Sequence, residues 1–237
     1  MGCGGSKAAT SKFTSACVMG DTAAATAILM REPNINVNLP DKDGVTCLVR
    51  CVLMDHADLV SMLLKHPETH PNLSDNTGRG ALDYAARFNK VEMVELLVAH
   101  PHININYKNM GGGTALHVAA QQGHPEVVKV LLGHQSVDVN VTTKDGATAL
   151  FIAAERGRKE VVEMLLATPQ VNVNLAMPWK LQGAVVEATP LFAASFQEEH
   201  EIVELLKKHP GVELPQYSTL GELKDSGAKE ELMEMAI

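Results

Sequence analysis

Apolar and polar positions recur along this chain with a period of 34 residues. Leucine occupies one repeat position in four successive units, and asparagine occupies another in five. The leucines are Leu48, Leu82, Leu116 and Leu150, and the asparagines are Asn38, Asn72, Asn106, Asn140 and Asn174. A fixed period of roughly 20 to 50 residues indicates stacked repeats, which decide how every local motif is interpreted.

The unit from 107 to 140 shows the pattern most clearly. It predicts a short helix that begins after Thr114 and buries Leu116 together with an Ala-Ala pair. A turn at Gly123 follows, and a second helix then carries Val-Val and Leu-Leu pairs at spacings of three and four, which form an amphipathic stripe. The alternation VDVN that closes the unit predicts a short extended hairpin arm.

The segment GTALHVAAQQGHPEVVKVLL in this unit resembles the ankyrin repeat, whose signature is G-x-T-P-L-H-x-A-A-x-x-G-H-x-x-V-V-x-L-L-L. The resemblance implies an all-α repeat solenoid of helix-turn-helix units joined by short β-hairpin-like loops. This chain departs from the signature mildly, because each unit is one residue longer and the usual proline appears only as Pro190. The register predicts a flexible leader over residues 1–11 and one repeat domain over 12–237. Its units lie near 12–38, 39–72, 73–106, 107–140, 141–174 and 175–215, with a truncated C-terminal cap over 216–237.

The sixth unit is displaced by seven residues. Thr189 follows Thr148 by 41 residues instead of 34, and the stretch 175–188 holds Trp179, the chain's only tryptophan. Insertions in repeat proteins map to exposed loops, often on the binding face. The sequence therefore predicts an exposed loop from which Trp179 reaches into a binding surface.

Composition and charge narrow the classes of partner. The formal net charge of −8 argues against nucleic acid, whose binding depends on cationic side chains, and against passive adsorption to anionic lipid. The sequence contains neither a signal-peptide core nor an apolar stretch of membrane-spanning length. The four cysteines are therefore predicted to be reduced thiols in a reducing compartment.

One repeat position carries a histidine in four units. These residues are His66, His100, His134 and His209. Stacked helices lie about 8–10 Å apart, whereas nitrogens that share a zinc ion lie within roughly 4 Å of each other. We therefore interpret these histidines as polar residues that end helices, and we predict no metal.

Other polar residues and cysteines also have structural interpretations. By the family resemblance, His117 hydrogen-bonds between repeats, and the asparagine series is predicted to satisfy turn backbone. Cys17, Cys47 and Cys51 replace small buried alanines of the register, so we expect them to be packed as small apolar residues. No hydrolase, metalloprotease or kinase signature occurs, so we predict no enzyme and no cofactor.

The resemblance also suggests which residues meet a partner. In ankyrin repeats, the two residues after the Ala-Ala pair of each first helix face a groove. Here they are Leu53 and Met54, Arg87 and Phe88, Gln121 and Gln122, Glu155 and Arg156, and Phe196 and Gln197. Aromatic, Met and Arg side chains are enriched in interface cores, so Arg87, Phe88, Phe196 and Trp179 are predicted anchors. Alternatively, a neighbouring segment such as the leader buries Leu53, Met54 and Phe88.

The first residues, MGCGGS, match the N-myristoylation signal M-G-x-x-x-[ST], with Gly2 as the acceptor. A phosphate loop is excluded because no strand precedes this stretch. A single myristoyl chain gives only marginal anchoring, so we expect S-palmitoylation of the adjacent Cys3 as the second signal. An unmodified flexible leader remains the alternative.

Together these features predict a non-enzymatic adaptor or scaffold. It is expected to be a monomer that presents an ankyrin groove to a protein partner, tethered by its N-terminal lipids to the cytoplasmic face of a membrane. One alternative is a soluble inhibitor or regulator that occludes a partner enzyme. Another is an enzyme whose site is built by the inserted stretch around Trp179.

Overall fold

The computed structural model describes residues 7–181 and 184–213. These residues form twelve helices and two strands. The helices are α1 (Lys7–Met19), α2 (Thr22–Arg31), α3 (Cys47–Met54), α4 (Ala57–Lys65), α5 (Ala81–Arg87), α6 (Val91–Val98), α7 (Ala115–Gln122), α8 (Pro125–Leu132), α9 (Ala149–Glu155), α10 (Lys159–Leu166), α11 (Pro190–Phe196) and α12 (His200–Lys208). The strands β1 (Met177–Leu181) and β2 (Ala184–Ala188) lie between α10 and α11. The predicted succession of helix pairs is confirmed.

Local signals in the sequence explain where the helices begin and end. Thr46, Thr148 and Thr189 precede α3, α9 and α11, and each threonine Oγ1 accepts the backbone N–H three residues later, at 3.4, 3.1 and 3.2 Å. These bonds satisfy one of the donors that a helix N-terminus leaves open. Gly123 ends α7 with a φ of 75°, a left-handed conformation that glycine adopts without steric cost.

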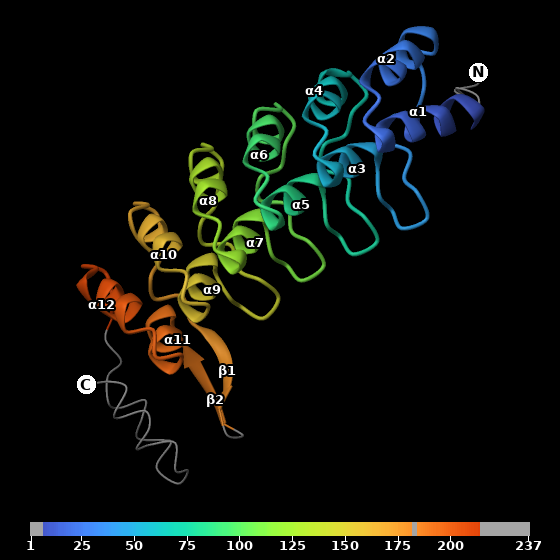
Figure 1. Ribbon diagram of the computed structural model, residues 1–237. Helices are drawn as coiled ribbons and strands as arrows, with labels where there is room; N and C mark the ends of the chain where they lie inside the picture. The colour runs from blue at the N-terminus through green and yellow to red at the C-terminus, as the bar shows by residue number, and fades with distance from the viewer. Residues whose placement is uncertain (1–6, 182–183, 214–237) are drawn as a thin grey trace. The chain divides into compact units, whose positions relative to one another are not determined.

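The described chain divides into two compact units. Unit 1 comprises Met1–Met110 and Gly133–Val137, and unit 2 comprises Gly111–Leu132 and Asp138–Ile237. In unit 1, the first helices α1, α3 and α5 pack side by side, and the second helices α4 and α6 pack on each other behind them (Figure 1). In unit 2, α9 packs between α7 and α11, and α10 packs between α8 and α12.

Small side chains allow this close packing. The Ala-Ala pairs of α5, α7, α9 and α11 are buried, as are the Val and Leu positions on one stripe of α8 and α10. Cys17, Cys47 and Cys51 are also buried and free, as their register position predicted. The core therefore lies between the two helices of each repeat and between neighbouring repeats of the same unit.

One predicted boundary differs from the structure. The leader was expected to extend to residue 11, but α1 begins at Lys7, so residues 7–11 are helical and only 1–6 lie outside the described residues. With 13 residues, α1 is longer than the first helices α3, α5, α7, α9 and α11. The predicted cap over 216–237 also lies outside the described residues.

The inserted stretch 175–188 was predicted to be an exposed loop, but it contains an antiparallel hairpin of β1 and β2. Met177 pairs with Ala188 and Trp179 with Val186, so these side chains share one face, which is buried or half-buried. Pro178, Lys180, Val185 and Glu187 lie on the other face and are exposed. This alternation is the pattern of a strand with one face packed on a core.

No helix in the described ranges is both long enough and apolar enough to span a bilayer.

Candidate functional site

The asparagine series fixes the loops that follow the second helices. Asn72 shows the arrangement: its Nδ2 donates to the His102 carbonyl at 2.7 Å, and its Oδ1 accepts the Asn104 N–H at 2.7 Å. Asn38, Asn140 and Asn174 bridge the backbone of the following repeat in the same two-bond way. Asn106 donates likewise to the Ser136 carbonyl. The predicted role in satisfying turn backbone is confirmed.

The histidine series ends helices, as predicted. In His66, His100, His134 and His209, Nδ1 accepts the backbone N–H two residues later, at 3.2 to 3.3 Å. Each imidazole therefore closes a local turn. Among the residues that the structure describes, no group of three or more His, Cys, Asp or Glu side chains could hold a metal ion.

His117 links two repeats inside unit 2. Its Nδ1 accepts from the N–H of Thr114 at 3.2 Å and lies 3.0 Å from the Thr114 hydroxyl, while its Nε2 lies 3.2 Å from the Ala147 carbonyl. A carbonyl can only accept, so Nε2 carries the proton in this arrangement. This buried histidine has the inter-repeat role that the family resemblance implied, because Ala147 belongs to the next repeat.

In unit 1, most predicted surface residues are accessible at the ends of first helices. Met54 and Phe88 are 48% and 52% exposed, Arg87 is exposed, and Leu53 is half-buried. The described residues thus do not bury Met54 or Phe88. Residues 1–6 of the leader, which would cover them in the alternative, lie outside the described residues. Large apolar side chains are therefore open to solvent on neighbouring first helices of this unit.

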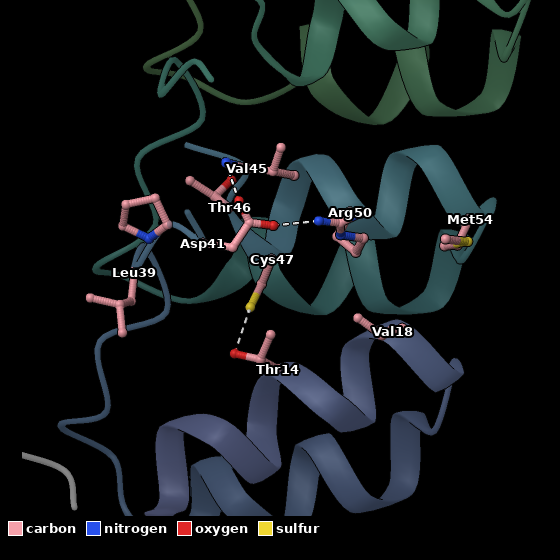
Figure 2. Close-up of a pocket in the computed structure, with 10 residues that line it drawn as sticks. Thr14, Val18, Leu39, Asp41, Val45, Thr46, Cys47, Arg50 and Met54 are labelled. Atoms are coloured by element: carbon pink, nitrogen blue, oxygen red, sulfur yellow. Dashed lines mark hydrogen bonds and ion pairs between the residues drawn. The ribbon is translucent and has the colours of Figure 1, made fainter. Parts of the chain in front are cut away.

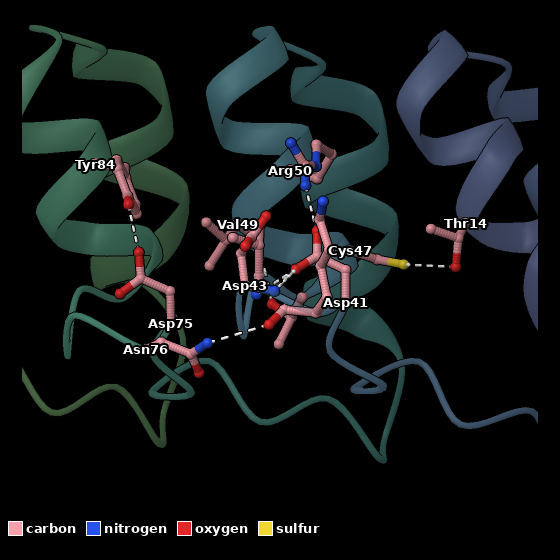
Figure 3. A network of polar contacts seen from close by, with 12 residues as sticks. Thr14, Asp41, Asp43, Cys47, Val49, Arg50, Asp75, Asn76 and Tyr84 are labelled. Carbon is pink, nitrogen blue, oxygen red and sulfur yellow. Dashed lines mark hydrogen bonds and ion pairs between the residues drawn. The ribbon is translucent and has the colours of Figure 1, made fainter.

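The exposed Phe88 ring is held in place by its neighbours. It stacks on Tyr84 with ring centroids 6.4 Å apart and planes 7° apart, and the Arg87 guanidinium lies 5.9 Å from its centroid. Tyr84 in turn donates its hydroxyl to Asp75, which anchors the stack to the loop before α5 (Figure 3). An aromatic side chain positioned in this way loses little further rotamer entropy on binding.

The loops before α3 and α5 are joined by polar contacts. The Asn76 N–H donates to the Asp43 carbonyl at 3.0 Å, and Asn76 Nδ2 donates to the Lys42 carbonyl at 3.2 Å (Figure 3). Asp41 accepts from backbone N–H groups within its own turn and forms an ion pair with Arg50 of α3. Partial burial opposes ionisation, but the N–H groups of Val45 and Asp43 and the Arg50 guanidinium hold the pKa of Asp41 below its ordinary value.

In unit 2, the predicted surface residues fall into two groups. Gln121, Gln122 and Arg156 are exposed, and the Arg156 Nε lies 3.5 Å from the Glu155 carboxylate. Phe196 is only half-buried but is covered by Trp179, whose ring centroid is 5.8 Å away.

Trp179 does not stand free as the sequence predicted. It contacts a cluster of phenylalanines from α9 and α11: its ring centroid is 5.7 Å from Phe151 and 6.4 Å from Phe192, in addition to Phe196. This aromatic cluster is the packed inner face of the hairpin. The indole therefore holds the inserted hairpin onto its own unit, because each ring pair adds attraction beyond the area it buries.

An apolar cleft of about 320 Å³ lies in unit 1 between α1, α3 and the loop before α3. Figure 2 shows Thr14 and Val18 on α1 facing α3, with Leu39 on the loop at one end and Met54 at the other. Cys47 is on the α3 side of the cleft, with its Sγ 3.6 Å from Thr14 Oγ1. Sequence reasoning missed this cleft, although Leu39 and Val18 are exposed apolar residues in the first two repeats.

The cysteines beside the cleft are not reactive thiols. The Cys47 thiol favours the charged form of Cys17, but the Cys51 thiol and burial outweigh it and raise the pKa of Cys17 to about 12. The Cys17 thiol and burial also raise the pKa of Cys47. Protonated thiols are poor nucleophiles, so these groups pack rather than react.

A buried carboxylate, Asp83 of α5, was also missed. Its Oδ2 accepts the Gly80 N–H at 3.0 Å, and Asn109 Nδ2 lies 3.5 Å from its Oδ1. Burial raises the pKa of Asp83 to about 6 against these two hydrogen bonds, which lower it. The register contains the signal, because Asp83 stands 34 residues before His117, at a position that holds Val49, Phe151 and Phe192 in three other repeats.

Comparisons with known proteins agree with this architecture. The family model described as "Ankyrin repeats (3 copies)" matches residues 13–109 and 102–177. None of the curated proteins matches the chain by sequence.

Solved structures give the same result. The crystal structure of EF0377, an ankyrin repeat protein, superposes with a TM-score of 0.74 at 23% identity, covering 84% of this chain and 98% of that one. An ankyrin repeat domain (ABAYE2397) from Acinetobacter baumannii AYE superposes with a TM-score of 0.71 at 26% identity, covering 81% of this chain and 94% of that one.

Proposed function

Because the chain belongs to the ankyrin repeat family, whose repeats generally mediate protein–protein interaction, we propose that it is a non-enzymatic adaptor whose binding surface includes Arg87 and Phe88. The observation that carries this proposal is the exposed Phe88 ring, fixed between Tyr84 and the Arg87 guanidinium. Half-exposed Met54, on the neighbouring first helix of the same unit, extends the apolar surface. Aromatic, Met and Arg side chains are the types enriched in interface cores.

Gln121, Gln122 and Arg156 provide adaptable polar contacts on unit 2 in this proposal, and Leu53 supports Met54. Trp179 and Phe196 contribute indirectly, since the aromatic cluster fixes the hairpin whose outer face carries Lys180 and Val185. The chain acts as a monomer at the cytoplasmic face of a membrane, where acyl groups on Gly2 and Cys3 hold it. Both acceptor residues lie outside the described residues, so the tether rests on the sequence motif alone.

The binding surface is tested by substituting Phe88 with Ala. Losing a central aromatic anchor should weaken partner capture by about tenfold or more, the effect of a hot spot near 2 kcal/mol. The measurement is affinity capture from lysate with quantitative mass spectrometry, comparing wild type with the variant. Met30→Ala is the control, because Met30 is 78% exposed on α2, away from Phe88. Partners retained equally by Phe88→Ala would contradict the proposed surface, provided that circular dichroism shows a folded variant.

The tether is tested by cell fractionation. Wild type should partition to membranes, Gly2→Ala should appear in the soluble fraction, and Cys3→Ser should be retained more weakly, because one myristoyl chain gives only about 10⁴ M⁻¹. If Gly2→Ala fractionates like wild type, lipidation at Gly2 does not hold the chain. If wild type itself is entirely soluble, the alternative of a soluble inhibitor or regulator takes precedence.

A further inference from the structure

The cleft in unit 1 is suited to a hydrocarbon chain. Apolar side chains line most of it: Val18 on α1, Leu39, Pro40 and Val45 on the loop, and Met54 on α3. Val18, Leu39 and Met54 are all exposed in the structure, which leaves apolar surface uncovered. The cleft's volume of about 320 Å³ lies at the lower end of the range of small-molecule pockets.

The charged groups at the cleft disfavour an anionic ligand. Among the described residues that line the cleft, Arg50 is the one cationic side chain, and it already forms an ion pair with Asp41 (Figures 2 and 3). A free fatty acid or an acidic peptide would have to compete with Asp41 for that guanidinium. An acyl chain joined through an amide brings no charge, so it can occupy the apolar strip and leave the Arg50–Asp41 pair intact.

We propose that this cleft binds the acyl chain carried by Gly2 of the same molecule. The inference rests on the acylation of Gly2 proposed above. The cleft is then a second site for the acyl group, so the protein alternates between a form with the acyl group in the cleft and a membrane-bound form.

The leader is long enough for this contact. Gly2 lies five residues before Lys7, where α1 begins. An extended chain of five steps can span about 17 Å. Thr14 lies seven residues along α1 from Lys7, which is about 10 Å at 1.5 Å per residue. An acyl group on Gly2 can therefore fold back to Thr14 and continue toward Val18 and Met54.

The two sites compete for one acyl group. Methylene groups gain by leaving water in either place, so even partial occupation of the cleft lowers the weak affinity of a single acyl chain for a membrane. Only the fraction of molecules with an empty cleft is competent to bind lipid. A second acyl group on Cys3 would add an anchor that remains when the first chain occupies the cleft, so it would shift the balance toward the membrane.

The experiment uses the full chain co-expressed with an N-myristoyltransferase, with the added mass confirmed by intact mass spectrometry. Binding to phosphatidylcholine vesicles is measured by sedimentation for wild type, Met54→Glu and Leu39→Glu. Each variant places a charge at an exposed cleft position, so the acyl chain is released and vesicle binding should rise about threefold or more. A ¹³C-labelled acyl chain should show contacts with Val18 and Leu39 methyl groups in wild type only.

Met30→Glu is the matched control, since it makes the same change at an exposed residue outside the cleft. Its vesicle binding should equal that of wild type, and zwitterionic lipid limits any effect of the added charge. Equal binding by all acylated forms would overturn the cleft proposal while leaving the tether intact. A chain that the transferase leaves unmodified would overturn both. If free myristate binds the cleft equally well in unacylated and acylated protein, the N-terminal acyl chain does not occupy the cleft and the assignment is wrong.

Discussion

Trp179→Ala should lower the free energy of unfolding by about 2–3 kcal/mol. Removing a fully buried aromatic side chain costs about 3–5 kcal/mol, and Trp179 is half-buried, which reduces the expected loss. The substitution removes three ring contacts at once, with Phe151, Phe192 and Phe196, and leaves the hairpin without its central attachment to α9 and α11. An isolated two-stranded hairpin is marginal in water, so β1 and β2 should also lose protection from hydrogen exchange.

The measurement is urea unfolding followed by far-UV circular dichroism, because the variant lacks the chain's only tryptophan. Lys180→Ala is the control, as Lys180 neighbours Trp179 on β1 but faces away and is exposed. It should change stability by less than about 0.5 kcal/mol. If Lys180→Ala were as destabilising as Trp179→Ala, the loss would come from the strand itself and not from the aromatic cluster.

This expectation replaces the one drawn from the sequence, in which Trp179 reaches from an exposed loop into a binding surface. That hypothesis treated the seven extra residues as a free loop. In the structure Trp179 packs on rings of its own unit. Loss of partner binding in Trp179→Ala could therefore come from a disturbed hairpin and would not identify a contact with a partner. Phe88 remains the position at which binding and folding can be separated, because its ring is about half exposed.

Asp83→Asn should stabilise the protein above pH 6 and remove part of its pH dependence. In the folded chain the pKa of Asp83 is about 6, above its ordinary value of 3.8, so the folded state binds the proton more tightly than the unfolded state. Stability from this group is therefore greatest below pH 4 and falls as the pH rises from about 4 to about 6. The difference between the two pKa values corresponds to about 3 kcal/mol in the free energy of unfolding. One unit of pKa change is worth about 1.4 kcal/mol.

An asparagine keeps an oxygen that can accept the Gly80 N–H and carries no charge to desolvate. The measurement is the midpoint of urea unfolding between pH 4 and pH 8. As the pH rises across this range, the urea midpoint should fall less in Asp83→Asn than in wild type. Asp43→Asn, a change at an exposed carboxylate of the same unit, should leave the decline as it is. Parallel profiles for wild type and Asp83→Asn would show that Asp83 ionises as it does in the unfolded chain.

The sequence predicted those features that the repeat itself encodes. The period of 34 locates the helix pairs, the Thr caps and the asparagine bridges, because each recurs at the same place in a similar environment. The same register marks Asp83, His117 and Phe151 as one buried position with different chemistry. Comparing the residues at this register position is therefore enough to indicate a buried carboxylate from the sequence.

Features outside the repeat could not be predicted in the same way. The hairpin of β1 and β2 depends on which residues of the insertion pair, and the packing of Trp179 depends on rings from two separate helices. The cleft arises where α1, α3 and the loop between α2 and α3 meet, so no single segment indicates it. The early start of α1 at Lys7 was missed because the other first helices begin later in the register.

The asparagine bridges run in one direction, from each repeat to the repeat that follows it along the chain. Asn72 and Asn140 each bond to backbone that lies about 30 residues further along the chain, in the turn of the next repeat. A turn therefore receives support from the repeat before it, and an asparagine is satisfied only when the repeat after it is folded. If the repeat on the C-terminal side is lost, the asparagine side chain lacks its backbone partners. If the repeat on the N-terminal side is lost, the turn lacks the two hydrogen bonds from the asparagine. The two sides of a repeat are thus unequal as places to shorten, extend or fuse this protein.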